Sequence, residues 1–261
     1  METALMATIS LALICLALGL IIGVVAKIFA VQIDPKIGVV EELLPGANCG
    51  GCGFAGCSDF AKAVVAGKAE PAGCPVCSAE NAAKIADEMG LSADGNVRKV
   101  AIVLCGGGME KASAAVNYNG VMDCKSAALV ADGFKGCAYG CLGFASCARA
   151  CPFDAIEMVD GLAVVHSDLC VGCGKCVATC PRNLIKLVPE TAKTHVYCSS
   201  PEKGPAKRKV CKVSCIGCRK CVKAAEEGQM EMDGFLAVVN YENPPSLDAV
   251  ETAKCPTGAF R

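Results

Sequence analysis

The densest chemistry in this chain is a run of cysteines with the spacing C-x2-C-x2-C-x3-C-P, formed by Cys170, Cys173, Cys176, Cys180 and Pro181. In bacterial ferredoxins such a run holds three corners of one iron–sulfur cluster, and its fourth Cys ligates a second cluster. A similar run with wider gaps precedes it, at Cys137, Cys141, Cys147 and Cys151. Structural zinc also uses C-x2-C pairs, but it rarely takes four Cys in so short a run followed by Pro.

The two runs together predict two [4Fe–4S] clusters that exchange their fourth ligands. The first predicted ligand set is Cys137, Cys141, Cys147 and Cys180. The second is Cys170, Cys173, Cys176 and Cys151.

A third set of cysteines lies in a Gly-rich stretch, LPGANCGGCGFAGC, followed by one more Cys. It predicts a single cluster held by Cys49, Cys52, Cys57 and Cys74, with Cys77 as the alternative to Cys74. The stretch also contains G-x-G-x-x-G, but without a preceding strand it does not indicate a nucleotide site. We expect two covering helices after it, with Ser58 and Ser78 as N-caps and Gly67 and Gly90 at their ends.

The C-terminal part repeats the central stretch, since MVDGLAVVHSD (158–168) is echoed by MDGFLAVVNYE (232–242). The counterparts of Cys170, Cys173 and Cys176 are missing there, and Ala225 stands for Cys151. This unit is therefore predicted to hold one cluster, with NPPSLDAVETA (243–253) filling the vacated space as a short helix. Its predicted ligands are Cys215, Cys218, Cys221 and Cys255, with Cys211 as the alternative to Cys218.

Four further cysteines have no local partner: Cys105, Cys124, Cys198 and Cys211. Their roles stay open, either as buried thiols or as an additional metal site. Around the first of them, residues 97–116 read as a strand, a Gly turn at 106–108 and a helix.

The chain begins with an uncharged run from Thr3 to Ala26. As a helix it is about 36 Å long, which is enough to span a bilayer. Lys27 and Lys36 follow the run, so the positive-inside rule places the C-terminal bulk in the cytoplasm.

The amino-acid composition is typical of a protein that metal–thiolate sites stabilise. Cysteine makes up 22 of 261 residues, Trp is absent and aromatic residues are few. A large apolar core is therefore not expected, and metal–thiolate bonds should supply much of the folding energy. The net charge of −1 argues against nucleic-acid binding. Disulfides are not expected in a reducing cytoplasm.

The predicted fold class is α+β: one N-terminal transmembrane helix followed by small ferredoxin-like iron–sulfur modules with βαβ elements. The expected division is a transmembrane helix (1–27), a linker (28–43), a single-cluster domain (44–91), a connector (92–135), a two-cluster ferredoxin domain (136–190) and a degenerate unit with one cluster (191–261). We expect about four [4Fe–4S] clusters in total and no catalytic site on this chain alone.

A membrane helix, the LPGANCGGCGFAGC motif with Cys74 and a two-cluster ferredoxin together resemble the B subunit of the Rnf complex, over about residues 1–188. That family belongs to a membrane-bound, ion-pumping ferredoxin–NAD oxidoreductase. The resemblance implies an electron relay on the cytoplasmic side of the bacterial cell membrane. Its implied partners are soluble ferredoxin and the other subunits, including the flavin- and NADH-binding C subunit. The alternatives are a stand-alone membrane-anchored polyferredoxin and a zinc-structured thiol protein.

Overall fold

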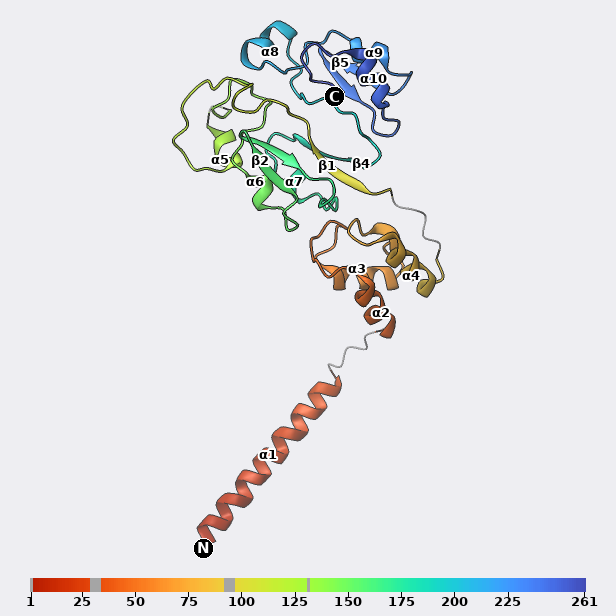
Figure 1. The fold of residues 1–261 in the computed structure, drawn as a ribbon. Coiled ribbons are helices and arrows are strands. Elements are labelled where there is room, and N and C mark those ends of the chain that lie inside the picture. Colours follow the sequence, from red (N-terminus) through yellow and green to blue (C-terminus); the bar gives the residue numbers. More distant parts are fainter. Residues whose placement is uncertain (1, 29–33, 92–96, 131) are drawn as a thin grey trace.

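The computed structural model describes residues 2–28, 34–91, 97–130 and 132–261. Parts of the predicted linker and connector, at 29–33, 92–96 and 131, lie outside the described residues. Figure 1 shows a single long helix, α1 (Glu2–Ile28), standing apart from three small bodies that follow one another along the chain. Its window Leu11–Ile28 has a mean hydropathy of 2.7 and none of it is buried, so this helix is long and apolar enough to cross a membrane.

The first module, residues 34–91, is helical. It contains α2 (Pro35–Leu43), α3 (Cys57–Val65), a 3-10 turn at Pro71–Gly73 and α4 (Ala79–Met89). The segment predicted as a linker is thus partly a helix that belongs to this module, because α2 packs its buried Val40 with Phe60 and Ile85. The predicted caps of α4 are confirmed at both ends by Ser78 and Gly90.

Helix α3 differs from the prediction in how it begins. Its N-cap is Gly56 and not Ser58, and the Cys57 N–H donates to the Asn48 Oδ1 atom at 2.8 Å. A Cβ atom at Gly56 would lie 2.7 Å from that same oxygen, so the cap requires glycine. The Asn48 side chain thereby ties the start of α3 to the cysteine loop before it.

The central module, residues 97–191, holds β1 (Lys99–Val103), α5 (Cys124–Leu129), α6 (Ser146–Arg149), β2 (Ile156–Val159), β3 (Leu162–Val165), α7 (Lys175–Thr179) and β4 (Ile185–Pro189). Strand β1, predicted to be in a connector, pairs antiparallel with β4 and so belongs to this module. The helix predicted after Gly108 is wrong. Ala112 and Ala114 instead form isolated β-bridges with Cys211 and Lys135.

The C-terminal unit, residues 192–261, contains α8 (Gly204–Val210), α9 (Lys220–Ala224), β5 (Met230–Asp233), β6 (Leu236–Val239) and α10 (Leu247–Ala253). The predicted repeat is visible in the strand registers. Ile156 pairs with Val165 in the central hairpin, and Met230 pairs with Val239 at the same positions of the second. The predicted helix after Pro244 and Pro245 is confirmed as α10.

The paired strands differ from the predicted βαβ arrangement, since β1–β4, β2–β3 and β5–β6 are each two-stranded antiparallel pairs. Around them the described apolar residues form four separate small clusters instead of one core. Cysteines lie within or against each of these clusters. The fold is therefore a set of small mixed helix–strand bodies in which thiols occupy the places where large side chains would otherwise pack.

Candidate metal centres

Four cavities in the described part of the chain are each lined by four cysteines. Their volumes are about 280, 330, 390 and 350 Å³, taken in the order first module, the two sites of the central module and C-terminal unit. We name them the Cys49, Cys170, Cys124 and Cys215 sites. The surrounding walls are apolar in each case, with backbone turns passing close to the thiols.

The Cys49 site brings together the four cysteines predicted for the first module: Cys49, Cys52, Cys57 and Cys74. Phe60, Val76 and Leu44 close it from the helical side. Burial raises the pKa of the Cys74 thiol, although backbone N–H groups of Val76 and Cys77 act in the opposite direction. Cys77, the predicted alternative, lies outside this lining and faces a separate hollow beside the central module.

The Cys170 site also gathers its predicted set: Cys151, Cys170, Cys173 and Cys176. Burial raises the pKa of Cys176 to about 12, and the neighbouring thiols Cys170 and Cys173 add to the shift. The Ala101 N–H of β1 donates to the Cys170 Sγ atom at 3.3 Å. Such N–H···S bonds favour a thiolate and tune the potential of a cluster that it holds.

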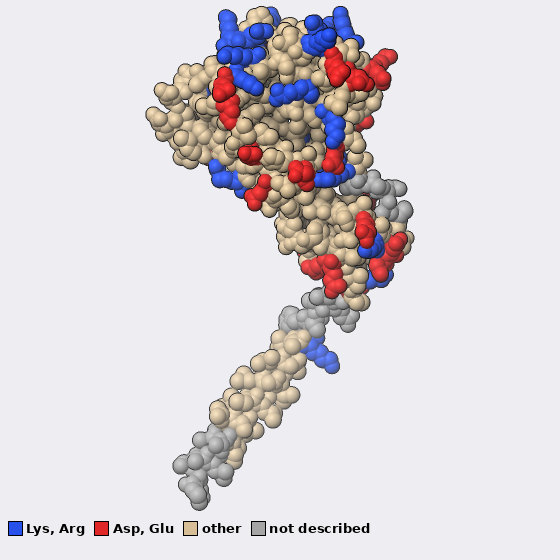
Figure 2. Space-filling model, viewed as in Figure 1, with Lys and Arg blue, Asp and Glu red and all other residues tan. Residues whose placement is uncertain are grey.

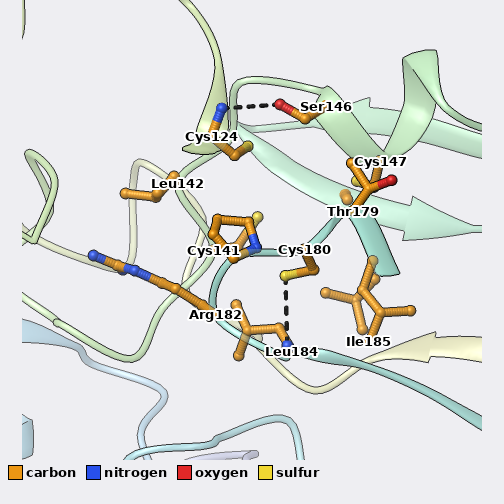
Figure 3. A pocket seen from close by; sticks show the side chains of 13 residues that line it. Cys124, Cys141, Leu142, Ser146, Cys147, Thr179, Cys180, Arg182, Leu184 and Ile185 are labelled. Carbon is orange, nitrogen blue, oxygen red and sulfur yellow. Dashed lines mark hydrogen bonds between the residues drawn. The ribbon is translucent and has the colours of Figure 1, made fainter. Parts of the chain in front are cut away.

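The Cys124 site differs from its predicted set. It is lined by Cys124, Cys141, Cys147 and Cys180, which Figure 3 shows arranged round one space. Cys137, predicted as the fourth member, is not among the described residues that line this cavity. Burial raises the pKa of Cys147 to about 11, with further contributions from Cys141 and Cys124.

Backbone conformation explains the exchange of Cys137 for Cys124. The loops Cys170–Cys176 and Cys215–Cys221 each have two residues of positive φ, one on either side of the middle Cys: Gly172 and Gly174 in the first, Gly217 and Arg219 in the second. Gly143 and Ala145 adopt the same conformation in the loop Cys141–Cys147. The residue between them is Phe144, so this loop lacks its middle thiol.

Cys124 supplies the missing thiol from another segment. Asp123 caps α5 by accepting from the N–H groups of Lys125 and Ser126, and it accepts from the Ser146 hydroxyl at 2.7 Å. That hydroxyl also accepts from the Cys124 N–H at 2.9 Å, as Figure 3 shows. Because Ser146 precedes Cys147, these bonds hold Cys124 next to the loop that it completes.

The side chain of Phe144 is not part of the lining of this cavity. Its ring lies 5.3 Å from the Phe134 ring and 5.3 Å from the Tyr118 ring, in an apolar cluster with Leu142. The sequence did contain a signal for this. In the internal repeat, Phe144 falls on Cys218, which shows that the wide C-x5-C spacing is a C-x2-C-x2-C loop with its middle Cys replaced.

The Cys215 site gathers Cys215, Cys218, Cys221 and Cys255, which is the set preferred from the sequence over the one containing Cys211. Burial raises the pKa of Cys221 to about 11. Burial would also raise the pKa of Cys255, but N–H groups of Phe260, Thr257 and Ala259 lower it overall. Cys218 is exposed, unlike the other cysteines of this site.

What can such sites hold? A tetrahedral zinc with bonds of about 2.3 Å would draw its sulfurs to within about 3.8 Å of one another. Among the described residues, no three Cys, His, Asp or Glu side chains converge closely enough to hold a single metal ion. Four thiols spread round a cavity of about 300 Å³ fit the corners of an iron–sulfur cluster instead.

Comparison with known proteins agrees with this chemistry. Residues 44–76 match the family described as "Putative Fe-S cluster", and residues 137–191 match the LdpA Fe-S cluster-binding domain. The chain is 42% identical to the B subunit of the ion-translocating oxidoreductase complex of Methanosarcina acetivorans, covering 94% of this chain and 92% of the relative.

Two further relatives carry more specific names. The B subunit of the proton-translocating ferredoxin:NAD(+) oxidoreductase complex of Clostridium ljungdahlii is 40% identical over 100% of this chain and 93% of its own length. The B subunit of the Na(+)-translocating ferredoxin:NAD(+) oxidoreductase complex of Acetobacterium woodii is 42% identical over 87% of this chain and 68% of its own length. An iron–sulfur protein with an apolar N-terminal helix, the chain belongs to the family of B subunits of Rnf-type ion-translocating ferredoxin:NAD oxidoreductase complexes.

Proposed function

We propose that this chain is a membrane-anchored relay that conducts single electrons through [4Fe–4S] clusters between soluble ferredoxin and the NAD-reducing, ion-pumping parts of its complex. The observation that carries the proposal is the set of four cavities, each lined by four cysteines. We assign one cluster to each, held by Cys49, Cys52, Cys57 and Cys74; by Cys151, Cys170, Cys173 and Cys176; by Cys124, Cys141, Cys147 and Cys180; and by Cys215, Cys218, Cys221 and Cys255.

Direct contacts between the cysteine loops favour an electron relay and argue against isolated structural metal sites. A Cβ atom at Gly51 in the first module would lie 3.0 Å from both the Cα and the carbonyl oxygen of Cys173, so the two loops touch. Burial raises the pKa of Cys173, and the Cys49 thiol from the other module adds to the shift. Within the central module, Cys176 and Cys147 lie in the same buried cluster. An electron can therefore pass among the Cys49, Cys170 and Cys124 sites without crossing solvent.

We infer that the C-terminal unit is the end that receives electrons from ferredoxin. Cys218 is exposed there, and the same unit carries exposed Lys and Arg side chains: Lys203, Arg208, Lys209, Lys212, Arg219, Lys220 and Lys223. Figure 2 shows basic side chains gathered at the end of the molecule farthest from α1. A surface of this charge attracts an acidic redox partner and accelerates its association.

The opposite end then faces the membrane and the partner subunits, of which we propose the flavin- and NADH-binding C subunit as one. Helix α1 lies next to the first module in the chain, so the Cys49 site is the one nearest the membrane anchor (Figure 1). Lys27 and Lys36 after the apolar run favour the cytoplasmic side for all of the clusters.

The proposal is tested by iron, zinc and acid-labile sulfide determination on the full chain purified anaerobically in detergent. The four clusters alone require about sixteen irons and as many sulfides per chain as a minimum, and EPR signals of reduced [4Fe–4S] centres after dithionite treatment. Zinc without sulfide would refute the electron-transfer function and support a zinc-structured thiol protein.

A further inference from the structure

Four cysteines outside these sites meet where the central module joins the C-terminal unit: Cys105, Cys137, Cys198 and Cys211. They come from four separate segments. Cys105 follows β1, Cys137 precedes the loop of the Cys124 site, and Cys198 and Cys211 flank α8 in sequence. Cys105 is buried and the other three are half-buried. The proposed function uses none of them.

Backbone contacts between neighbouring residues bring the four segments together. The Gly106 N–H donates to the Tyr197 carbonyl at 3.0 Å, which places Cys105 beside Cys198. A Cβ atom at Gly107 would lie 3.1 Å from the Cys211 Sγ atom and 3.9 Å from the Cys105 Sγ atom, so both sulfurs flank this glycine. A Cβ atom at Gly136 would lie 3.1 Å from the Val210 Cγ1 atom, which brings Cys137 beside Cys211.

The pKa shifts of these thiols show the same proximity between the four segments. Burial raises the pKa of Cys137, and the Cys198 and Cys211 thiols raise it further. Burial also raises the pKa of Cys211, with Cys105 and Cys198 adding to the shift. Each of the four thiols is thus close to at least one other member of the group.

A buried positive charge next to these thiols points to an anionic occupant. Lys135 is 4% exposed, and its Nζ atom donates to the Gly107 carbonyl at 3.0 Å. The ion pairs found among the described residues do not include Lys135, although burying an ammonium group without a counter-charge is costly. The charge lies close enough to Cys105 and Cys211 to lower the pKa of both thiols against the effect of burial.

A second cation lies next to Cys137, at the edge of the Cys124 site. The half-buried Arg182 guanidinium donates to the Cys137 carbonyl at 3.0 Å and to the Gly140 carbonyl. Thiolate-ligated iron–sulfur clusters carry net negative charge, which buried cations of this kind offset. The Cys141 N–H donates to the Cys105 Sγ atom at 3.4 Å, the same kind of bond that Cys170 receives from Ala101 and Cys180 receives from Leu184.

We propose that Cys105, Cys137, Cys198 and Cys211 hold a fifth [4Fe–4S] cluster, which connects the central module with the C-terminal unit. Zinc fits less well, because zinc ligands usually come as C-x2–4-C pairs and none of these four cysteines is paired in that way. With this cluster, twenty of the 22 cysteines are ligands, and only Cys15 and Cys77 are left over.

The position of this site completes the relay. Cys105 lies in the buried cluster that contains Cys147 and Cys176, whereas Cys198 packs against the cluster that contains Cys215 and Cys221. An electron leaving the Cys215 site therefore has a cluster to enter before it reaches the Cys124 site.

The test replaces each of the four cysteines by Ser in the full chain and counts irons after anaerobic purification. The parent chain should contain about twenty irons, and each of Cys105→Ser, Cys137→Ser, Cys198→Ser and Cys211→Ser should lose about four while the EPR signals of the other clusters remain. Cys15→Ala is the matched control and should lose none. About sixteen irons in the parent chain, or unchanged iron in any one of the four variants, would overturn the proposal.

A second measurement does not depend on the folding of a ligand variant. Lys135→Met keeps the side-chain volume but removes the charge, so one cluster should become harder to reduce while the iron content stays the same. The exposed Lys111→Met variant, in the segment that also carries Gly107, is the control. A redox titration in which Lys135→Met moves no midpoint potential would contradict a cluster at this place. The absence of all sulfide would instead refute the proposed function itself, so the two failures are distinguishable.

Discussion

The exchange of Cys137 for Cys124 can be tested by moving a thiol. In Cys124→Ser the Cys124 site keeps three of its four thiols. In the double variant Cys124→Ser with Phe144→Cys, a thiol returns at the position that Cys173 and Cys218 occupy in their loops. Gly143 and Ala145 already have positive φ values of 79° and 58°, close to the 70° and 62° of Gly217 and Arg219. The backbone therefore needs no change to present the new thiol.

The expected sizes follow from the contacts. Cys124→Ser should lose one cluster, or about four irons. Replacing Phe144 removes two aromatic contacts with centroid distances of 5.3 Å, each worth about 0.5–1.5 kcal/mol. The double variant should thus be less stable by about 1–3 kcal/mol in this apolar cluster and yet regain its iron.

The assay is iron and sulfide content per chain, measured beside a thermal unfolding curve. Cys124→Ser with Phe144→Ser is the matched control, because it loses the same packing without gaining a thiol. Restored iron in the Cys variant but not in the Ser variant supports the assignment. Full iron content in Cys124→Ser alone would refute it, since the loop would then draw its fourth ligand from elsewhere.

Three further predictions concern the contacts around the sites. Gly51→Val should push the first module away from Cys173, and this overpacking should destabilise the protein by about 1–3 kcal/mol. Reduction of the Cys49 site in stopped-flow experiments should become slower without loss of iron. Gly38→Val should have no such effect, since no atom lies within 4 Å of a Cβ atom there. Reversing charge with Arg208→Glu and Lys209→Glu should slow reduction by an acidic ferredoxin about tenfold at low salt, and unchanged rates relative to Lys68→Glu would show that this surface is not the docking site. Ser146→Ala removes the hydroxyl that donates to Asp123 and accepts from the Cys124 N–H, so the free energy of unfolding should fall by about 1–3 kcal/mol. Iron chelators should also remove iron from this variant faster. Chelation kinetics equal to those of the parent chain would contradict this role of Ser146.

The sequence predicted which cysteines line one cavity best where the thiols lie in regular local spacing. The Cys49, Cys170 and Cys215 sites gather their predicted members because each loop carries its first three Cys within nine residues, and one further Cys completes each set. The Cys124 site departs from this pattern, since one of the thiols that line it comes from helix α5, which the hydrogen bonds of Asp123 and Ser146 hold beside the loop Cys141–Cys147. No local spacing encodes a hydrogen bond between segments about twenty residues apart.

The predictions of the fold likewise succeeded within single segments and failed where distant segments pair. The repeat, the capped helix α4 and the C-terminal helix α10 follow from patterns within single segments, and the structure contains all three. The helix expected after Gly108 does not form, because its alanines pair with Cys211 and Lys135 from distant segments. The same long-range pairing brings Cys137 and Cys211 near Cys105. The sequence left Cys105, Cys198 and Cys211 open as part of an additional metal site, but with Cys124 as the fourth member and not Cys137.

The relay itself is tested most directly by the order in which the clusters are reduced. In rapid freeze-quench EPR with reduced ferredoxin as the donor, the Cys215 site should be reduced first and the Cys49 site last. Cys255→Ser should remove about four irons, leave the other clusters loaded and greatly slow their reduction by ferredoxin, while dithionite still reduces them. If the Cys49 site is reduced at the same rate in Cys255→Ser as in the parent chain, electrons do not enter through the C-terminal unit, which contradicts the proposed relay.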